Sequence, residues 1–156
     1  MPNYQPEVTG AIYDSEECLL GSILIESTRG TNEAIREVSK LVEPGDFLGC
    51  MISDPPDRWT WRARMYYAML QCELPPHTVN VAKKMVELEI LHDKDLSLMA
   101  HCVAVVPCSL DYLHYARAVK DYSLQRKVKY HAAKGNFKRL NELTSNIKFM
   151  GGVEGL

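Results

Sequence analysis

Apolar residues recur at intervals of three and four along most of the chain, and this spacing predicts a succession of amphipathic helices. The predicted helices cover about residues 15–26, 32–43, 62–70, 78–90, 94–105, 107–135 and 136–148. The run 103–106 also fits a short strand, but the spacing before it favours a helix. The side chains expected to face inward are Leu19, Leu20, Ile23, Leu24, Ile35, Val38, Leu41 or Val42, Met65, Tyr66, Met69, Val81, Met85, Leu88, Leu96, Met99 and Val103.

The longest patterned stretch runs from Pro107 to Gly135. Ser109 is expected to cap this helix, Asp111 places a carboxylate in its first turn, and Gly135 ends it. Small residues lie beside a helical face that we expect to contact other protein, formed by Tyr112, Tyr115, Val119, Tyr122 and Arg126. The segment after Gly135 presents a second apolar face, formed by Phe137, Leu140, Leu143 and Ile147. Two helices joined at a glycine predict an antiparallel hairpin.

These elements predict an all-α protein, with a small globular helical bundle followed by a protruding antiparallel helical hairpin. The expected parts are a flexible arm over 1–13, the globular domain over 14–105, the hairpin over 106–148, and a flexible tail or the start of a linker over 149–156. Asp14 and Glu17 have capping-box spacing at the first helix. Gly21 lies inside that helix, which predicts close approach of a neighbouring helix.

The segment 48–61 interrupts the helical pattern and contains Pro55 and Pro56. Because proline cannot donate a backbone hydrogen bond, we expect a surface loop here. Trp59 and Trp61 are interpreted as core or loop anchors rather than as a platform for stacking nucleobases.

The charge is unevenly distributed, although the formal net charge is only −2. Residues 1–60 carry four basic and eleven acidic side chains, and residues 61–156 carry fourteen and nine, so the two parts bear −7 and +5. Such a chain is not expected to wrap a nucleic acid with its whole surface. The five cysteines include no Cys-x-x-Cys, and no apolar run approaches a bilayer span of about 20 residues. We therefore expect free thiols and a soluble, cytoplasmic protein without membrane contact.

No catalytic, cofactor or metal site is predicted. None of the ten lysines is followed by Ser or Thr, so the chain has no phosphate-binding P-loop. Asp93, Lys94 and Asp95 are interpreted as a solvated loop. The one cluster of soft metal ligands lacks zinc spacing and is expected to pack rather than to bind metal: His101, Cys102, Cys108 and His114.

Several residues also match a known pattern in order and spacing. Pro107, Ser109, Asp111, Tyr115, Ala116, Val119 and Arg126 form its most specific part, and Glu16-Glu17, Leu20-Gly21 and Asp46-Phe47 extend it. The chain thereby resembles the N-terminal domain of DnaB-type replicative DNA helicases over about residues 14–130. The chain departs from the pattern by about eight extra residues in 48–62, by Arg62 in place of a histidine, and by His77 in place of an aspartate.

The resemblance implies a non-catalytic collar domain, or a stand-alone relative of it, that acts in DNA replication and primosome assembly. It implies homo-oligomers, as dimers or as a trimer of dimers in a full-length ring, with primase or a helicase loader as partner and only weak DNA binding. The expected interaction residues of the hairpin are Tyr112, Tyr115, Val119, Tyr122, Arg126, Leu140, Leu143 and Ile147. The alternative is a nucleic-acid-binding module that uses helix 110–134, with phosphate contacts from Arg117, Lys120, Lys127 and Lys129.

Overall fold

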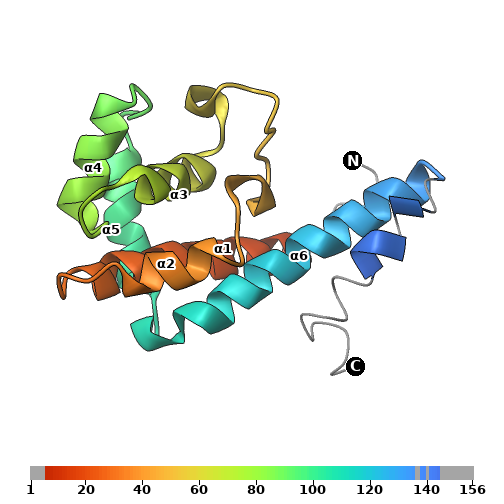
Figure 1. Ribbon diagram of the computed structural model, residues 1–156, viewed down its shortest axis with the longest axis horizontal. Helices are drawn as coiled ribbons and strands as arrows, with labels where there is room; N and C mark the ends of the chain where they lie inside the picture. The colour runs from red at the N-terminus through yellow and green to blue at the C-terminus, as the bar shows by residue number, and fades with distance from the viewer. Residues whose placement is uncertain (1–5, 136–137, 140, 145–156) are drawn as a thin grey trace.

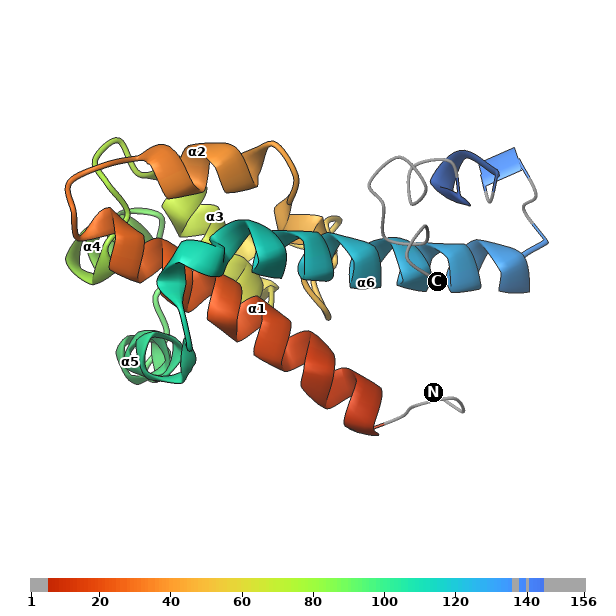
Figure 2. The same cartoon turned by 90° about the horizontal axis from the view of Figure 1, so that it is seen from below.

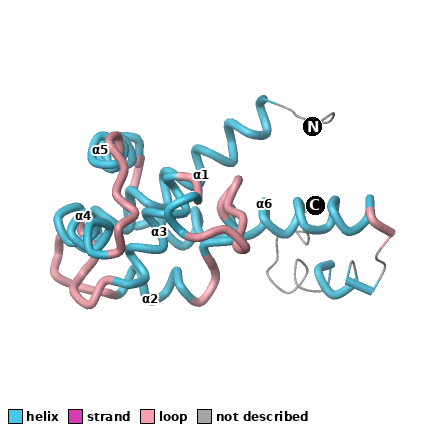
Figure 3. The backbone as a smooth tube through the Cα atoms, turned by 90° about the horizontal axis from the view of Figure 1, so that it is seen from above, coloured by secondary structure: helices cyan, strands magenta, loops and turns pink. Residues whose placement is uncertain are grey.

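The computed structural model describes residues 6–135, 138–139 and 141–144, and all regular structure in these ranges is helical (Figures 1 and 3). This confirms the predicted all-α class. The elements are α1 (Pro6–Ser27), α2 (Glu33–Ser39), η1 (Pro44–Asp46), η2 (Pro56–Arg58), α3 (Trp61–Gln71), α4 (Thr78–Glu87), α5 (Asp95–Val105), η3 (Ser109–Asp111) and α6 (Tyr112–Ala133), where η marks a 3-10 helix.

Helix α1 is the central element, because α2, α3, α5 and α6 all pack on it (Figure 2). Its apolar face is fully buried, as the spacing predicted, with Leu19, Leu20, Ile23 and Leu24 at most 1% exposed. The predicted inward residues of α2, α3 and α4 join the same core: Ile35, Val38, Val42, Met65, Tyr66, Met69, Val81 and Met85. One continuous core therefore holds these helices together.

The prediction of a flexible arm over residues 1–13 is wrong for residues 6–13, because α1 begins at Pro6. Proline fits the first turn of a helix, where its missing N–H has no partner to lose. Thr9 and Ile12 are already buried in this first part. Asp14 consequently lies within the helix and does not start it.

Gly21 allows α5 to lie directly against α1. A Cβ atom at this position would lie 2.1 Å from the carbonyl oxygen of Cys102 and 2.4 Å from Cγ2 of Val106. Only a residue without a side chain permits this distance between two helix backbones. The close approach predicted from Gly21 is confirmed.

The inward face of α5 differs from the prediction. Met99 is buried, but Leu96 and Val103 are 54% and 36% exposed. Asp95 and Cys102 face inward instead, because the contact with Gly21 turns the Cys102 side of the helix toward α1. The alternative strand over 103–106 is not formed, since α5 continues to Val105.

The 48–61 segment is an exposed loop that carries the short helix η2, as expected for a proline-rich insertion. Trp59 anchors it: the indole Nε1–H donates to the carbonyl oxygens of Met51 and Asp54 at 2.9 and 3.0 Å. The indole itself is buried in the core. The interpretation of Trp59 as a loop anchor is confirmed.

Helix α6 begins later than predicted. Ser109 lies in η3, and its hydroxyl donates to Glu26 of α1; its oxygen is not the side-chain cap of α6. The helix ends at Ala133, and Gly135 follows with φ +69°, a left-handed conformation that suits glycine. Figures 1 and 2 show that the distal half of α6 extends beyond the globular bundle.

Candidate interaction surface on helix α6

The proximal half of α6 belongs to the core of the chain itself. Val119 is 1% exposed and packs in the main cluster, and Tyr112 and Tyr115 lie partly buried against that cluster. Tyr122 is half-buried. The face predicted to contact other protein thus contacts α1 and its neighbours.

The distal half of α6 carries a separate apolar contact. Leu143 is 2% exposed and packs against Leu124, with Val128 beside them. Of the other apolar residues predicted after Gly135, Phe137, Leu140 and Ile147 lie outside the described residues. Leu143 therefore belongs to an intrachain contact with α6.

Asp46 holds the middle of α6 against η1. Its buried carboxylate accepts hydrogen bonds from the hydroxyl of Ser123 at 2.6 Å and from the N–H of Glu43 at 2.8 Å. The ammonium groups of Lys120 and Lys127 lie 3.2 and 3.4 Å away. Burial alone would raise the pKa of Asp46, but these donors outweigh it and leave the pKa below its usual value. A charged Asp46 therefore stabilises the docked helix.

This arrangement changes the set of predicted phosphate contacts. Lys120 and Lys127 pair with Asp46, whereas Arg117 and Lys129 are exposed. Arg117 lies on the proximal half of α6, and Lys129 lies on the distal half. The structure does not bring the four cations together on one free face.

Arg126 of α6 and Glu16 of α1 both bond to the backbone of residues 46–48. Arg126 donates from Nη2 to the carbonyl oxygen of Asp46 at 2.7 Å, and Glu16 accepts the N–H of Leu48 at 2.7 Å. Arg126 Nη1 and Glu16 Oε1 are buried without a hydrogen-bond partner. Burial raises the pKa of Glu16 to about 7, and the Leu48 N–H and the guanidinium groups of Arg62 and Arg126 only partly oppose this. Glu16 therefore titrates near neutral pH.

The titration of Glu16 predicts a pH-dependent stability. Because the pKa of Glu16 is about 7 in the folded chain and 4.5 ordinarily, the folded state holds this proton more tightly. Its contribution is complete below pH 4.5 and is lost as the pH rises to about 7. Relative to Glu16→Gln, the parent should lose about 3 kcal/mol of unfolding free energy over this range.

Urea denaturation of both proteins at several pH values between 4.5 and 7.5 measures this difference. Glu73→Gln is the control, because Glu73 is exposed. Its profile should parallel that of the parent. Parallel profiles for the parent and Glu16→Gln would show that Glu16 does not titrate in this range.

A third polar cluster joins α1, α3 and α5. Glu17 accepts from Arg62 at 2.7 Å and bonds to His101 Nε2 at 2.6 Å. The Arg62 guanidinium also lies over the rings of Tyr13 and Trp61, at 4.0 and 4.5 Å from their centroids. Arg62, which replaces the histidine of the resembled pattern, thus connects α3 to α1 directly and to α5 through Glu17. Sequence reasoning missed this cluster because its members are far apart in the chain.

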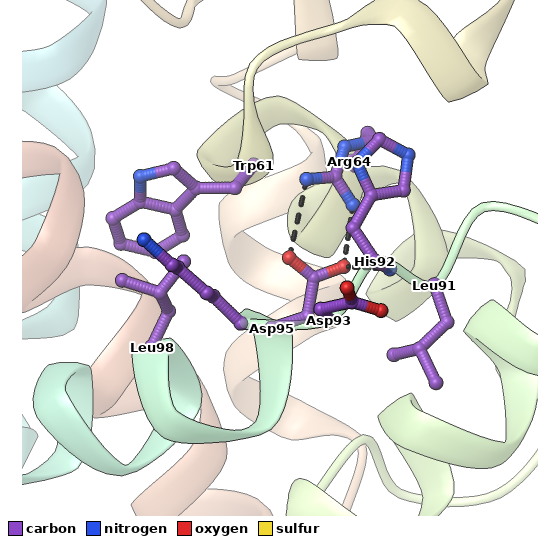
Figure 4. Close-up of a pocket in the computed structure, with 8 residues that line it drawn as sticks. Trp61, Arg64, Leu91, His92, Asp93, Asp95 and Leu98 are labelled. Atoms are coloured by element: carbon purple, nitrogen blue, oxygen red, sulfur yellow. Dashed lines mark hydrogen bonds and ion pairs between the residues drawn. The ribbon is translucent and has the colours of Figure 1, made fainter.

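A surface hollow of about 650 Å³ lies between α3 and α5, with Trp61, His92 and Lys94 on its walls (Figure 4). Its floor is the ion pair of Arg64 and Asp95, which are 4% and 1% exposed. The interpretation of Asp95 as a solvated loop residue is wrong. Asp95 is buried because Arg64 donates from both terminal nitrogens to its two carboxylate oxygens and the His92 N–H also donates to it.

Four of the five N–H donors of Arg64 have partners inside the protein. Its Nε donates to the carbonyl oxygen of Trp59 at 3.1 Å, and its Nη1 also donates to that of Ile90 at 2.8 Å. Together with Asp95, these partners accept the hydrogen bonds of the Arg64 guanidinium inside the protein. The pair therefore ties α3 to α5 and to the loop between α4 and α5.

Among the described residues, no group of three His, Cys, Asp or Glu side chains has a geometry that could hold a metal ion. Burial raises the pKa of Cys102 to about 12, which disfavours the thiolate that a metal would require. In the same part of the chain no single helix has the length and apolarity to cross a bilayer; only α5 taken with residues 109–133, bent by 101°, meets both criteria as a pair.

Comparison with known proteins found no family model and no curated protein that matches the chain. The geometry described above is therefore the basis for a functional proposal. Its chief elements are the distal half of α6 and the buried polar contacts that hold the middle of this helix.

Proposed function

We propose that the chain is a non-catalytic oligomerisation and protein-interaction domain, equivalent to the collar of a DnaB-type replicative DNA helicase or to a stand-alone relative of it. It would act in DNA replication through contacts with a primase or a helicase loader. The observation that carries the proposal is the projection of α6 beyond the globular bundle, together with the burial of Leu143 against Leu124.

Leu143 supports a helical hairpin. Residues 141–144 are helical, and Leu143 contacts the distal half of α6 near Leu124 and Val128. A return helix that packs on α6 covers only one of its faces, and the polar contacts of α6 with η1 described above end at Lys127. A second copy of the chain is the proposed cover for part of the remaining surface.

The outer faces of α4 and α5 support contact with another protein. They form an apolar hollow of about 540 Å³ lined by Thr78, Val79, Ala82, Val86, Leu91 and Leu96. Val79 and Val86 are 57% and 59% exposed, whereas Val81 and Met85 on the other face of α4 are buried in the core. Exposed apolar clusters of this kind are typical of protein-binding surfaces.

The charged groups that the fold buries support a structural rather than a catalytic role. Asp46 pairs with lysines of α6, Asp95 pairs with Arg64, and Glu17 pairs with Arg62. Each pair connects different helices of the bundle. These charges are thus engaged in holding the scaffold in one geometry.

Sedimentation velocity over a wide concentration range tests the proposal. The parent should self-associate, and Leu143→Asp should shift it toward monomer, because an unpaired carboxylate beside Leu124 would detach the return segment from α6. Gln71→Asp places the same charge on an exposed position of α3, outside α6, and should leave the association unchanged.

Circular dichroism should show that the bundle stays folded in both variants. A parent that remains monomeric at hundreds of micromolar would contradict the proposal. So would a folded Leu143→Asp protein that sediments like the parent at every concentration.

A further inference from the structure

The distal half of α6 lies in a segment without acidic residues. No Asp or Glu occurs between Asp121 and Glu142, and the segment carries Arg126, Lys127, Lys129, Lys134, Lys138 and Arg139. Twenty consecutive residues thus bear only positive formal charge in a chain whose net charge is −2. Such a concentration of cations produces a local positive potential that attracts polyanions.

The structure separates the cations that are engaged from those that face solvent. Arg126 and Lys127 bond to Asp46, and Arg139 pairs with Glu142 at 3.0 Å. The remaining three cations are exposed: Lys129, Lys134 and Lys138. These positions follow the distal part of α6 and the short helical segment after it, away from the bundle (Figure 2).

An exposed aromatic ring lies among these cations. Tyr130 is 59% exposed, whereas the other tyrosines of α6 are half-buried or packed against the core. Lys134 Nζ lies 5.6 Å from the centre of the Tyr130 ring, and His131 contacts the ring edge to face at 5.1 Å. Because Lys127, Tyr130 and Lys134 are spaced three and four residues apart, they share one side of the helix.

This combination favours one class of partner. Single-stranded nucleic acid offers phosphates to the lysines and an unpaired base to the tyrosine ring, whereas the bases of a duplex are stacked and unavailable. An acidic protein surface would use the lysines without the ring. A membrane surface would require apolar anchors, and the exposed neighbours of Tyr130 are Lys129, Ala132 and Ala133.

We propose that the distal part of α6, from Lys129 to Lys138, binds single-stranded nucleic acid, with Tyr130 stacked on a base and Lys129, Lys134 and Lys138 on the phosphates. The inference does not depend on the oligomerisation proposed above, because it rests on the exposed surface of one chain. Self-association and nucleic-acid binding are also measured separately.

Fluorescence anisotropy with a labelled 20-nucleotide thymidine strand tests the inference, at salt concentrations from 50 to 300 mM. The affinity for the parent should fall steeply as salt rises. Tyr130→Ala should weaken binding by about 5- to 100-fold with little change in salt dependence, because it removes stacking and no charge. Lys134→Ala should weaken binding and reduce the logarithmic salt slope by about 0.7.

Arg117→Ala is the matched control, since it removes an exposed cation from the proximal half of α6. It should bind like the parent. The inference fails if the parent does not bind the strand at 50 mM salt, or if Tyr130→Ala and Lys134→Ala bind as tightly as Arg117→Ala. Equal affinity for polyglutamate, or binding to anionic lipid vesicles in place of the strand, would also overturn it.

Discussion

Replacing Arg64 with methionine is expected to lower the free energy of unfolding by about 3 to 5 kcal/mol. The substitution leaves the carboxylate of Asp95 buried at 1% exposure, with the N–H of His92 as its one remaining hydrogen-bond donor among the described residues. It also removes the donors to the carbonyl oxygens of Trp59 and Ile90. The cost arises mainly from an uncompensated charge in the interior, because methionine retains much of the packing of the arginine stem.

Urea denaturation followed by circular dichroism measures this loss. Arg58→Met is the control, because Arg58 is exposed at the end of η2 and its replacement should change stability by less than about 0.5 kcal/mol. The double variant Arg64→Met/Asp95→Leu should recover part of the loss, since both charges are then absent. A loss below about 1 kcal/mol for Arg64→Met would show that the pair contributes little.

Replacing Gly21 with alanine is expected to destabilise the chain by about 1 to 3 kcal/mol, although alanine is the better helix former by about 1 kcal/mol. The new methyl group would lie 2.1 Å from the backbone oxygen of Cys102. Because a backbone atom cannot rotate away as a side chain can, α5 would have to move off α1. That movement would expose part of the buried face of α5, which includes Met99 and Cys102.

Gly10→Ala is a matched control on the same helix, since no heavy atom lies within 4 Å of a Cβ built there. This variant should be more stable than the parent by about 0.4 to 1 kcal/mol. Thermal unfolding of the two variants beside the parent gives the comparison. If both substitutions raised the midpoint, α5 would not be tightly held at Gly21.

The buried apolar faces of α1, α3 and α4 could be predicted because the apolar residues of each face recur every three or four residues within one helix. Leu19 to Leu24 and Met65 to Met69 show that spacing directly, and the predicted positions within α1, α3 and α4 are buried, whereas Leu88, just after α4, is partly buried. Gly21 was informative for a related reason: a glycine inside a strong helical pattern points to backbone contact. The partner helix, however, could not be read from that residue alone.

The polar contacts were harder to predict because their partners are distant in sequence. Asp95 meets Arg64 across 31 positions, and Asp46 meets Ser123 across 77. In the sequence, Asp46 stands out only as part of the Asp46-Phe47 step of the resembled pattern. Phe47 is buried in the core. A small signal for its role did exist, since Ser123 on the buried face of α6 is flanked by Lys120 and Lys127 at helical spacing.

The turn of α5 toward Cys102 and the early start of α1 had other causes. A helix with apolar residues nearly all round has no single preferred face, so the contact at Gly21 decided which side of α5 is buried. Pro6 and Gly10 lower the intrinsic helix propensity of the first turns, but tertiary contacts of Thr9 and Ile12 offset this.

The polar contact of α6 with Asp46 acts as a pivot, and the part of α6 beyond it acts as a lever arm. Six residues separate Lys127, the last residue of α6 that pairs with Asp46, from Ala133, which at 1.5 Å per residue leaves about 9 Å of helix beyond this contact. A small tilt of α6 at Asp46 and Glu16 would move its C-terminal end, at Ala133, by a larger distance. Charged groups, and not close-packed apolar groups, form the contact at Asp46, so pH and salt concentration would change the tilt of α6. The position of a partner bound at the end of α6 would change with that tilt.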